Sequence, residues 1–332
     1  MISKSLRAKI GDLLREEAPG PGEAATKPSR NGKREEAAPA EPRRPLARGR
    51  TVQPVPIEEV LPGGIVENAE GALFVHERLY TDLGERPMPL IRKIAALDRG
   101  SYDDDERAAA VNRERRRRAR SRTRAKRPRL VRDLPDVAAA VDPPERGLFR
   151  RFGHRRFLYL DIETCGLSAA PVFLVGIAFV AERNVVFRQL FARNYAEERA
   201  LLAEVARTAR DFDALVTFNG KTFDAPFLRD RAVHHRLPFA LPQPHLDLLW
   251  MARRRWREHL PNCRLQTLEW RILRRRRGGG DVDGSEIPGL YHDYVKRGEP
   301  HRLVPVFHHN LLDVVAMVEL TPPIFDPETG TY

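Results

Sequence analysis

Two carboxylates at the end of one strand-like run are the first feature of this 332-residue chain that points to chemistry. Asp161 and Glu163 end the run FLYLDIET, and the alternation of side chains along a strand places both on the same face. Neighbouring carboxylates repel each other and lose hydration, so a folded chain tolerates them best around a cation, most simply a hard divalent ion. The structural alternative for such a pair is a solvated strand end.

Two further acids extend the pattern. Asp224 follows the apolar run ALVTF through a short turn, a position where aspartate also serves as a helix N-cap. Asp313 lies in the apolar segment 304–320, where a carboxylate would be destabilising unless it pairs, for example with one of the many arginines. The joint order D-x-E, D, D predicts a metal site formed by Asp161, Glu163, Asp224 and Asp313.

A pair of histidines precedes the last acid. His308 and His309 come five and four residues before Asp313, so either can lie about one helical turn away from it and act as a general base. We favour His308 as the base and keep His309 as the alternative. The structural reading of either residue is an ordinary core histidine.

The elements that must position these residues follow from the apolar pattern. Three β-like runs in succession predict an antiparallel meander, and a helix, a buried strand and further helices follow it. This order predicts an α/β fold, a mixed sheet flanked by helices. The strands are expected at 157–162, 172–180, 184–192 and 214–218, and the helices at 195–212, 224–235, 264–273 and 304–320.

The rest of the chain differs in composition. Residues 1–55 are expected to be a disordered tail, 56–98 a small β element packing on the main domain, 99–150 an arginine-rich linker or arm, and 151–325 the main domain. The chain carries 58 Lys and Arg against 46 Asp and Glu, a net charge of +12. Twelve basic residues between 111 and 132 face one acid, which favours a phosphate-tracking arm over a solvated linker. Its densest part is Arg115, Arg116, Arg117 and Arg118.

Composition also bounds the surroundings of the protein. An anionic partner, nucleic acid or phospholipid, fits the net charge, but no apolar run approaches the roughly 20 residues of a membrane span. Cys165 and Cys263 are too few for a disulfide scaffold, which fits a reducing cytoplasm. We therefore expect a cytoplasmic protein with a nucleic-acid partner and no membrane.

The large aromatic residues that follow the acidic motifs are expected mostly in the core: Phe223, Phe227, Trp250, Trp256 and Trp270.

The acidic motifs resemble those of the DEDD, or DnaQ-like, exonuclease superfamily, which has the ribonuclease H-like fold. The matching residues are Asp161 and Glu163 in FLYLDIETCG, Asp224 in FNGKTFDAPF and Asp313 in HHNLLDVVAM. The blocks HLDLLWMARRRW, PNCRLQTLEWRIL and IPGLYHDYVKRG resemble the YprB-like ribonuclease-H-like proteins in particular, as does PVPIEEVLPGGIVENAEGALFVHERL near the start. The resemblance covers roughly residues 57–320, apart from the arginine-rich insert.

This resemblance implies a metal-dependent 3′→5′ exonuclease acting on DNA or RNA, with two Mg²⁺ or Mn²⁺ ions. Members of the superfamily place a His five residues before the last Asp or a Tyr four before it, whereas this chain has a His at both positions. Asn219 and Lys221 become candidates for holding the terminal nucleotide, with turn chemistry as the alternative. A competing reading from another class is a non-catalytic nucleic-acid binding or scaffolding protein that keeps the fold.

Overall fold

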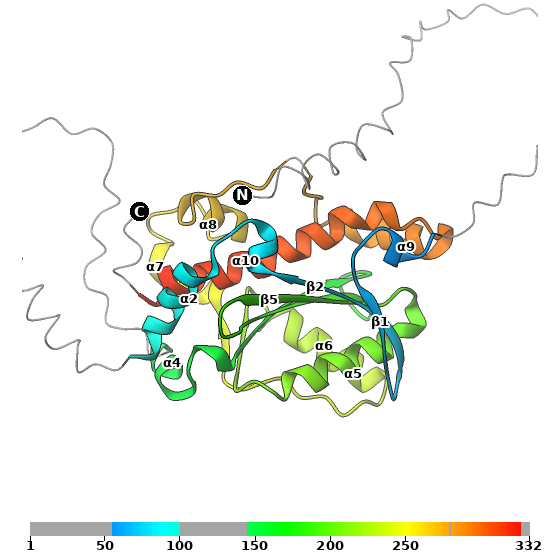
Figure 1. The fold of residues 1–332 in the computed structure, drawn as a ribbon, viewed down its shortest axis with the longest axis horizontal. Helices are drawn as coiled ribbons and strands as arrows, with labels where there is room; N and C mark the ends of the chain where they lie inside the picture. Colours follow the sequence, from blue (N-terminus) through cyan, green and yellow to red (C-terminus); the bar gives the residue numbers. More distant parts are fainter. Residues whose placement is uncertain (1–54, 100–144, 279, 327–332) are drawn as a thin grey trace, which may run out of the picture. The chain divides into compact units, whose positions relative to one another are not determined.

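A seven-stranded mixed sheet organises the residues that the computed structural model describes, which are 55–99, 145–278 and 280–326 (Figure 1). The strand order is β1-β2-β5-β4-β3-β6-β7; neighbours from β1 to β3 are antiparallel, and β6 and β7 continue the sheet parallel to β3. The predicted mixed α/β sheet and the β3-β4-β5 meander are confirmed. The strands are β1 (Gly64–Asn68), β2 (Gly71–Leu79), β3 (Phe157–Thr164), β4 (Val172–Val180), β5 (Val185–Phe191), β6 (Ala214–Thr217) and β7 (His245–Asp247).

The first hairpin belongs to the main sheet. We expected residues 56–98 as a small element packing on the main domain, but β2 pairs directly with β5, with Phe74 opposite Phe191. A two-stranded hairpin is marginal alone, and this pairing satisfies one of its edges. Helix α4 (Arg146–Phe152) begins inside the stretch assigned to the linker. The predicted tail and the arm at Arg115–Arg118 lie outside the described residues.

Helices cover both faces of the sheet (Figure 1). Phe157 and Tyr159 of β3 pack in one cluster with α10 (Val304–Phe325), α7 (Leu248–Trp256), α8 (Leu265–Arg271) and α2 (Pro87–Ala95). Leu158 and Leu160 pack on the opposite face with α5 (Glu198–Ala209) and α6 (Asp224–His234). Because side chains alternate along a strand, Asp161 continues the α10 face. The helix α9 (Ile287–Arg297) contributes to a third cluster with Phe173 and Phe191.

Helix α10 is the central helix of this unit. The helical stretch Pro300–Phe325 is long and apolar enough to cross a membrane by length and composition, but most of its apolar window is buried, as in the core helix of a globular domain. Gly176 of β4 lets α10 approach the sheet, because a Cβ there would lie 2.7 Å from Val314 Cγ2 and closer still to Asn310. The predicted helix at 304–320 is confirmed and continues to Phe325, whereas β7, α7 and α9 were not predicted as separate elements.

Candidate active site

One row of residues across the sheet orients Asp161. Asp161 on β3 lies opposite Gly176 on β4, and Gly176 lies opposite Gln189 on β5. The space above Gly176 is filled by Asn310 of α10, which is fully buried and donates its Nδ2 to Asp161 Oδ2 at 2.9 Å. Gln189 Nε2 donates to Asn310 Oδ1 at 2.9 Å and to the Phe307 carbonyl at 2.8 Å. These bonds fix which way the Asn310 amide points, so its donor group faces the carboxylate.

The predicted acids share one electrostatic environment. Burial raises the pKa of Asp161 well above its ordinary value, and the charges of Asp313, Asp224 and Glu163 raise it further. Burial also raises the pKa of Glu163 to about 8, with Asp313 and Asp224 acting in the same direction. The charges of the acids on β3, α6 and α10 therefore act on one another.

Asp224 lies at the start of α6 and is 5% exposed. Burial raises its pKa to about 7, although hydrogen bonds from the backbone N–H groups of Ile162 and of Asp224 itself act in the opposite direction. Its position is set by the preceding turn, in which Asn219 has a left-handed φ of 67°. The buried carboxylate of Asp247 accepts hydrogen bonds from the backbone N–H groups of Asn219 and Lys221 at 2.9 and 3.0 Å.

The proposed substrate-binding residues have local partners. The Asn219 side-chain oxygen accepts a hydrogen bond from Thr222 Oγ1 at 3.0 Å, in agreement with the turn-chemistry alternative. The Lys221 ammonium lies 5.2 Å from the centre of the Trp250 ring, and Trp250 is 48% exposed.

The expectation that the large aromatic residues lie in the core holds for Phe227 and Trp256 but is wrong for Trp250 and Trp270, which are exposed.

Asp313 has an arginine partner. Arg277, whose side chain is 8% exposed, donates from Nη2 to Asp313 Oδ1 and to the buried Glu269, and from Nη1 to Asp281 at 3.3 Å. The alternative that Asp313 pairs with an arginine is therefore realised. Burial opposes the charged form of Arg277, but its hydrogen bonds and the charges of Glu269 and Asp313 outweigh it and raise the pKa. This guanidinium partly neutralises a region crowded with carboxylates.

The two histidines face different surroundings. His309 Nδ1 lies 2.7 Å from Asp281 Oδ1, and its Nε2 lies 3.6 Å from Asp313 Oδ2. Burial opposes protonation of His309, but the hydrogen bond to Asp281 and the charges of Asp313 and Glu163 raise its pKa. Burial lowers the pKa of His308, and the charge of Asp281 only partly opposes this. The structure thus brings His309 to the acids, although we favoured His308 from the sequence.

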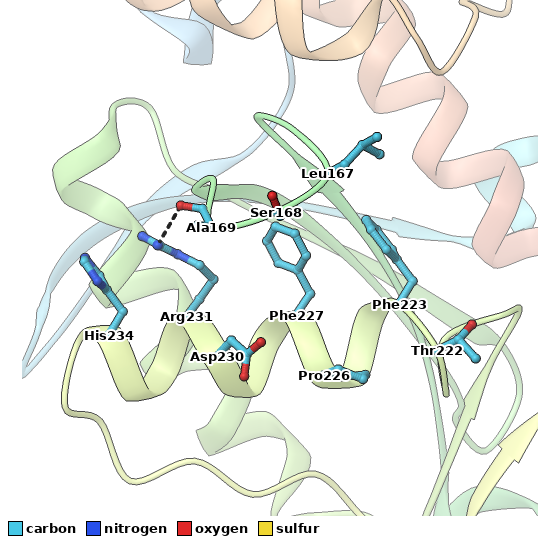
Figure 2. A pocket seen from close by; sticks show the side chains of 10 residues that line it. All are labelled: Leu167, Ser168, Ala169, Thr222, Phe223, Pro226, Phe227, Asp230, Arg231 and His234. Atoms are coloured by element: carbon cyan, nitrogen blue, oxygen red, sulfur yellow. Dashed lines mark hydrogen bonds between the residues drawn. The ribbon is translucent and has the colours of Figure 1, made fainter.

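A pocket of about 340 Å³ lies beside α6, lined by the loop after β3 and by one face of the helix (Figure 2). Leu167 stands on the loop side and is 89% exposed, while Phe223 and Phe227 project from the helix. Arg231 closes one end, where its Nη1 donates to the Ala169 carbonyl at 3.2 Å. The lining includes Phe223, the chain neighbour of Asp224, and the loop from Leu167 to Ala169, a few residues after Glu163.

The acids fit a divalent cation in their chemistry. All four predicted ligands are hard carboxylate oxygens, and burial, with neighbouring carboxylates acting in the same direction, raises the pKa of Asp161, Glu163 and Asp224. As they stand in the described part of the chain, no three His, Cys, Asp or Glu side chains converge closely enough to hold a metal ion. In addition, Asp313 Oδ1 accepts a hydrogen bond from Arg277. A cation that binds Asp313 Oδ1 would share this carboxylate with the Arg277 guanidinium or displace the guanidinium from it.

Sequence reasoning missed several residues of this site. Asn310, Gln189 and Arg277 contact the acids or orient their partners, and Asp281 holds His309. Asn310 lies in the same motif as Asp313, and its polarity in an apolar helix was a usable signal. Gln189 and Arg277 carried no such signal, because their partners lie far away along the chain.

Comparison with known proteins agrees with this architecture. The model of the RNase_H superfamily matches residues 158–323, and the chain belongs to that superfamily. A relative of it is a Bacillus subtilis (strain 168) protein named "Uncharacterized protein YprB", 35% identical over 178 residues, which are 51% of this chain. The chain spans 42% of the length of that relative. A solved structure of the family B DNA polymerase from the archaeon Pyrobaculum calidifontis overlaps 51% of this chain and 24% of the polymerase, with 18% identity and a TM-score of 0.42.

Proposed function

We propose that the protein is a metal-dependent 3′→5′ exonuclease that hydrolyses phosphodiester bonds in DNA or RNA. The observation that supports the proposal is the mutual influence of the charges of four acids on β3, α6 and α10, beside a histidine that contacts Asp281 and Asp313. The superfamily assignment supports a nuclease. The 3′→5′ direction is proposed from the resemblance of the acidic motifs.

Each residue has a distinct task in this proposal. Asp161, Glu163, Asp224 and Asp313 would hold two Mg²⁺ or Mn²⁺ ions, whose chemistry when bound is to activate the attacking water and to stabilise the leaving oxygen. Asn310 positions Asp161 through its 2.9 Å hydrogen bond. Arg277 positions Asp313 and competes with a cation for the same oxygen.

His309 is the base that the geometry favours. In the neutral tautomer that carries its proton on Nδ1, this N–H donates a hydrogen bond to Asp281, and Nε2, 3.6 Å from Asp313 Oδ2, would accept the proton of the attacking water. The neighbouring acids raise the pKa of His309 and stabilise its protonated form. Among the described residues His308 has no hydrogen bond to a carboxylate, and burial lowers its pKa, so its role in this proposal is structural.

The pocket beside α6 is proposed to take the terminal nucleotide. Phe223 and Phe227 offer aromatic surface to a base, and Phe223 immediately precedes Asp224 in the chain. Lys221, in the turn before α6, is proposed to contact a phosphate. The Asn219 side chain is engaged with Thr222, so a substrate contact from it requires that bond to be exchanged.

A second candidate is a nucleic-acid binding or scaffolding protein without catalysis. The ion pair of Asp313 with Arg277 favours it, because an internal cation already neutralises one of the proposed metal ligands. The two candidates differ in whether a divalent ion displaces that contact.

Cleavage of 5′-labelled single-stranded DNA and RNA, with and without Mg²⁺ or Mn²⁺, tests the proposal. We expect a ladder that shortens from the 3′ end, is absent in EDTA, and is blocked by a 3′-phosphate on the substrate. If the substrate with the 3′-phosphate gave the same products as the unblocked substrate, that result would contradict 3′→5′ action. Binding without any metal-dependent cleavage would favour the scaffolding candidate.

A further inference from the structure

The end of α8 and the turn that follows it carry five arginines within residues 271–277, and only some of them have acidic partners. Arg277 pairs with Glu269, Asp281 and Asp313, and Arg275 pairs with Glu319 at 2.8 Å. Within the described residues, Arg271 and Arg276 have no carboxylate partner. Both guanidinium groups instead lie over the same indole ring.

This arrangement, called here the Trp270 stack, consists of Trp270, Arg271 and Arg276. The guanidinium carbon of Arg271 lies 3.9 Å from the Trp270 ring centre, and that of Arg276 lies 4.6 Å from it. Trp270 is 40% exposed, and both arginines are exposed. The stack is therefore an accessible surface feature that holds two positive charges close together.

The backbone explains why the stack forms. Arg274 adopts a left-handed φ of 55°, and the Arg275 N–H donates to the Glu269 carbonyl at 3.0 Å, which folds the chain back along the end of α8. The next two side chains then diverge: Arg276 lies over Trp270, while Arg277 reaches inward to Glu269 and Asp313. One turn thus carries both an arginine that binds Asp313 and an arginine of the exposed stack.

The stacked arginines are suited to phosphate. A guanidinium that lies flat on an aromatic ring keeps its N–H edge free, and this planar fork matches the oxygens of a phosphodiester. Stacking also restricts the arginine rotamers before a ligand arrives, which lowers the entropic cost of binding. Because cations already lie over the indole, we assign the contact to the guanidinium groups and not to stacking of a base on Trp270.

We propose that the Trp270 stack binds the phosphodiester backbone of the nucleic-acid strand whose end lies in the carboxylate site. The proposal rests on the proposed function for the identity of the partner. Two observations carry it: the two guanidinium groups have no carboxylate partner within the described chain, and Arg277 links their turn to Asp313. The stack accordingly contributes affinity and salt dependence without selecting a base sequence.

The first test measures binding of a fluorescein-labelled oligothymidylate to the full chain in EDTA, so that no cleavage occurs. The double variant Arg271→Gln/Arg276→Gln is expected to bind roughly 10-fold more weakly at low salt. Its slope of log affinity against log salt should fall by about 1.4, since each phosphate contact to a single strand contributes about 0.7. The arginine-rich stretch is the same in all proteins compared, so the difference reports on the stack.

A matched control removes the same charge elsewhere. Arg183, in the turn between β4 and β5, and Arg210, just after α5, are both exposed, and both follow elements that end away from the acidic end of β3. Arg183→Gln/Arg210→Gln should change affinity less than twofold. Equal losses in the two double variants, or no loss in the first, would overturn the proposal.

The second test uses the wild-type protein and does not depend on how a variant folds. Phenylglyoxal modifies accessible arginines, and mass spectrometry measures the rate at each one. The oligonucleotide should protect Arg271 and Arg276 at least threefold, and leave Arg183 and Arg210 unchanged. Protection by polyglutamate but not by the oligonucleotide would overturn the choice of partner. If the protein cleaves nucleic acid but the oligonucleotide does not protect Arg271 and Arg276 from phenylglyoxal, this inference is refuted and the proposed function is not. If the oligonucleotide protects both arginines but the protein does not cleave, only the proposed nuclease activity is refuted.

Discussion

Replacing Glu198 with glutamine tests the ion-pair network that supports the wall of the pocket. Arg231 of α6 donates to Glu198 from Nη2 at 2.6 Å and from Nε at 2.7 Å, and His235 Nε2 lies 2.7 Å from the same carboxylate. The backbone N–H of Val172, at the start of β4, also donates to Glu198 at 2.9 Å. The side chains of Glu198 and Arg231 are 2% and 9% exposed, so water does not screen this ion pair. The network joins α5, α6 and the segment after β3.

The expected loss of stability follows from this burial. Removing one partner of a buried ion pair costs about 3 to 5 kcal/mol, because the other charge is left buried without compensation. A glutamine oxygen still accepts a hydrogen bond, so we expect the lower end, about 3 kcal/mol. Urea unfolding followed by tryptophan fluorescence measures the change in the free energy of unfolding.

Glu204 provides the matched control. It lies on the same helix with a side chain that is 4% exposed, but its partner Arg207 is 59% exposed. A pair with one partner in solvent is worth about 1 kcal/mol or less, so Glu204→Gln should be nearly neutral. A loss for Glu198→Gln no greater than that for Glu204→Gln would refute the reasoning.

The same network predicts a pH dependence. Burial raises the pKa of Glu198, but the hydrogen bonds from Arg231, His235 and the Val172 N–H outweigh it, and the net pKa is lowered. A lowered pKa in the folded state means that the stabilisation is present above the ordinary carboxyl pKa and is lost as pH falls through the lowered value. The difference between wild type and Glu198→Gln should therefore shrink below about pH 4. A difference that stays constant down to pH 3 would contradict this cause.

Three further predictions concern the acidic site. Gly176→Ala should destabilise the protein by about 2 to 4 kcal/mol in urea unfolding, because its Cβ would meet α10; a neutral effect would contradict the close approach. Arg277→Gln should lower the thermal midpoint of the metal-free protein by leaving Glu269 buried without its cation, and Mn²⁺ should recover part of the loss; an unchanged midpoint would exclude this role. His309→Gln should reduce kcat by about 10²- to 10⁴-fold and His308→Gln by less than tenfold, and comparable losses would count against His309 as the base.

The strands of the sheet could be predicted from sequence where a strand forms an apolar run long enough to be recognised by itself. The runs 157–162, 172–180 and 184–192 are apolar and bounded by turns, and the structure places β3, β4 and β5 there. β7 has only three residues, His245–Asp247, which is too short for any periodicity to show. The hairpin at 56–98 was recognised, but its pairing with β5 depends on a contact between distant segments.

In the candidate site, too, the features set by local sequence could be predicted, and those set by contacts between distant segments could not. Alternation along β3 predicted that Asp161 and Glu163 share a face; in the structure Asp161 accepts a hydrogen bond from Asn310 of α10, and the charges of His309 and Asp313 of α10 act on Glu163. The arginine that binds Asp313 could not be predicted, because Arg277 lies in a glycine- and arginine-rich turn without periodicity. The choice between His308 and His309 depended on Asp281, whose approach to one imidazole only the folded chain reveals.

The most direct test of the account compares wild type and Asp161→Asn in cleavage and in binding of the same single strand. Asp161 lies among the acids and is held by Asn310, and asparagine keeps that shape while removing the charge. We predict that turnover with Mg²⁺ or Mn²⁺ is lost, while the affinity measured in EDTA stays within a few-fold of wild type. Cleavage by Asp161→Asn at the wild-type rate would contradict the assignment of these acids as the metal-binding catalytic centre.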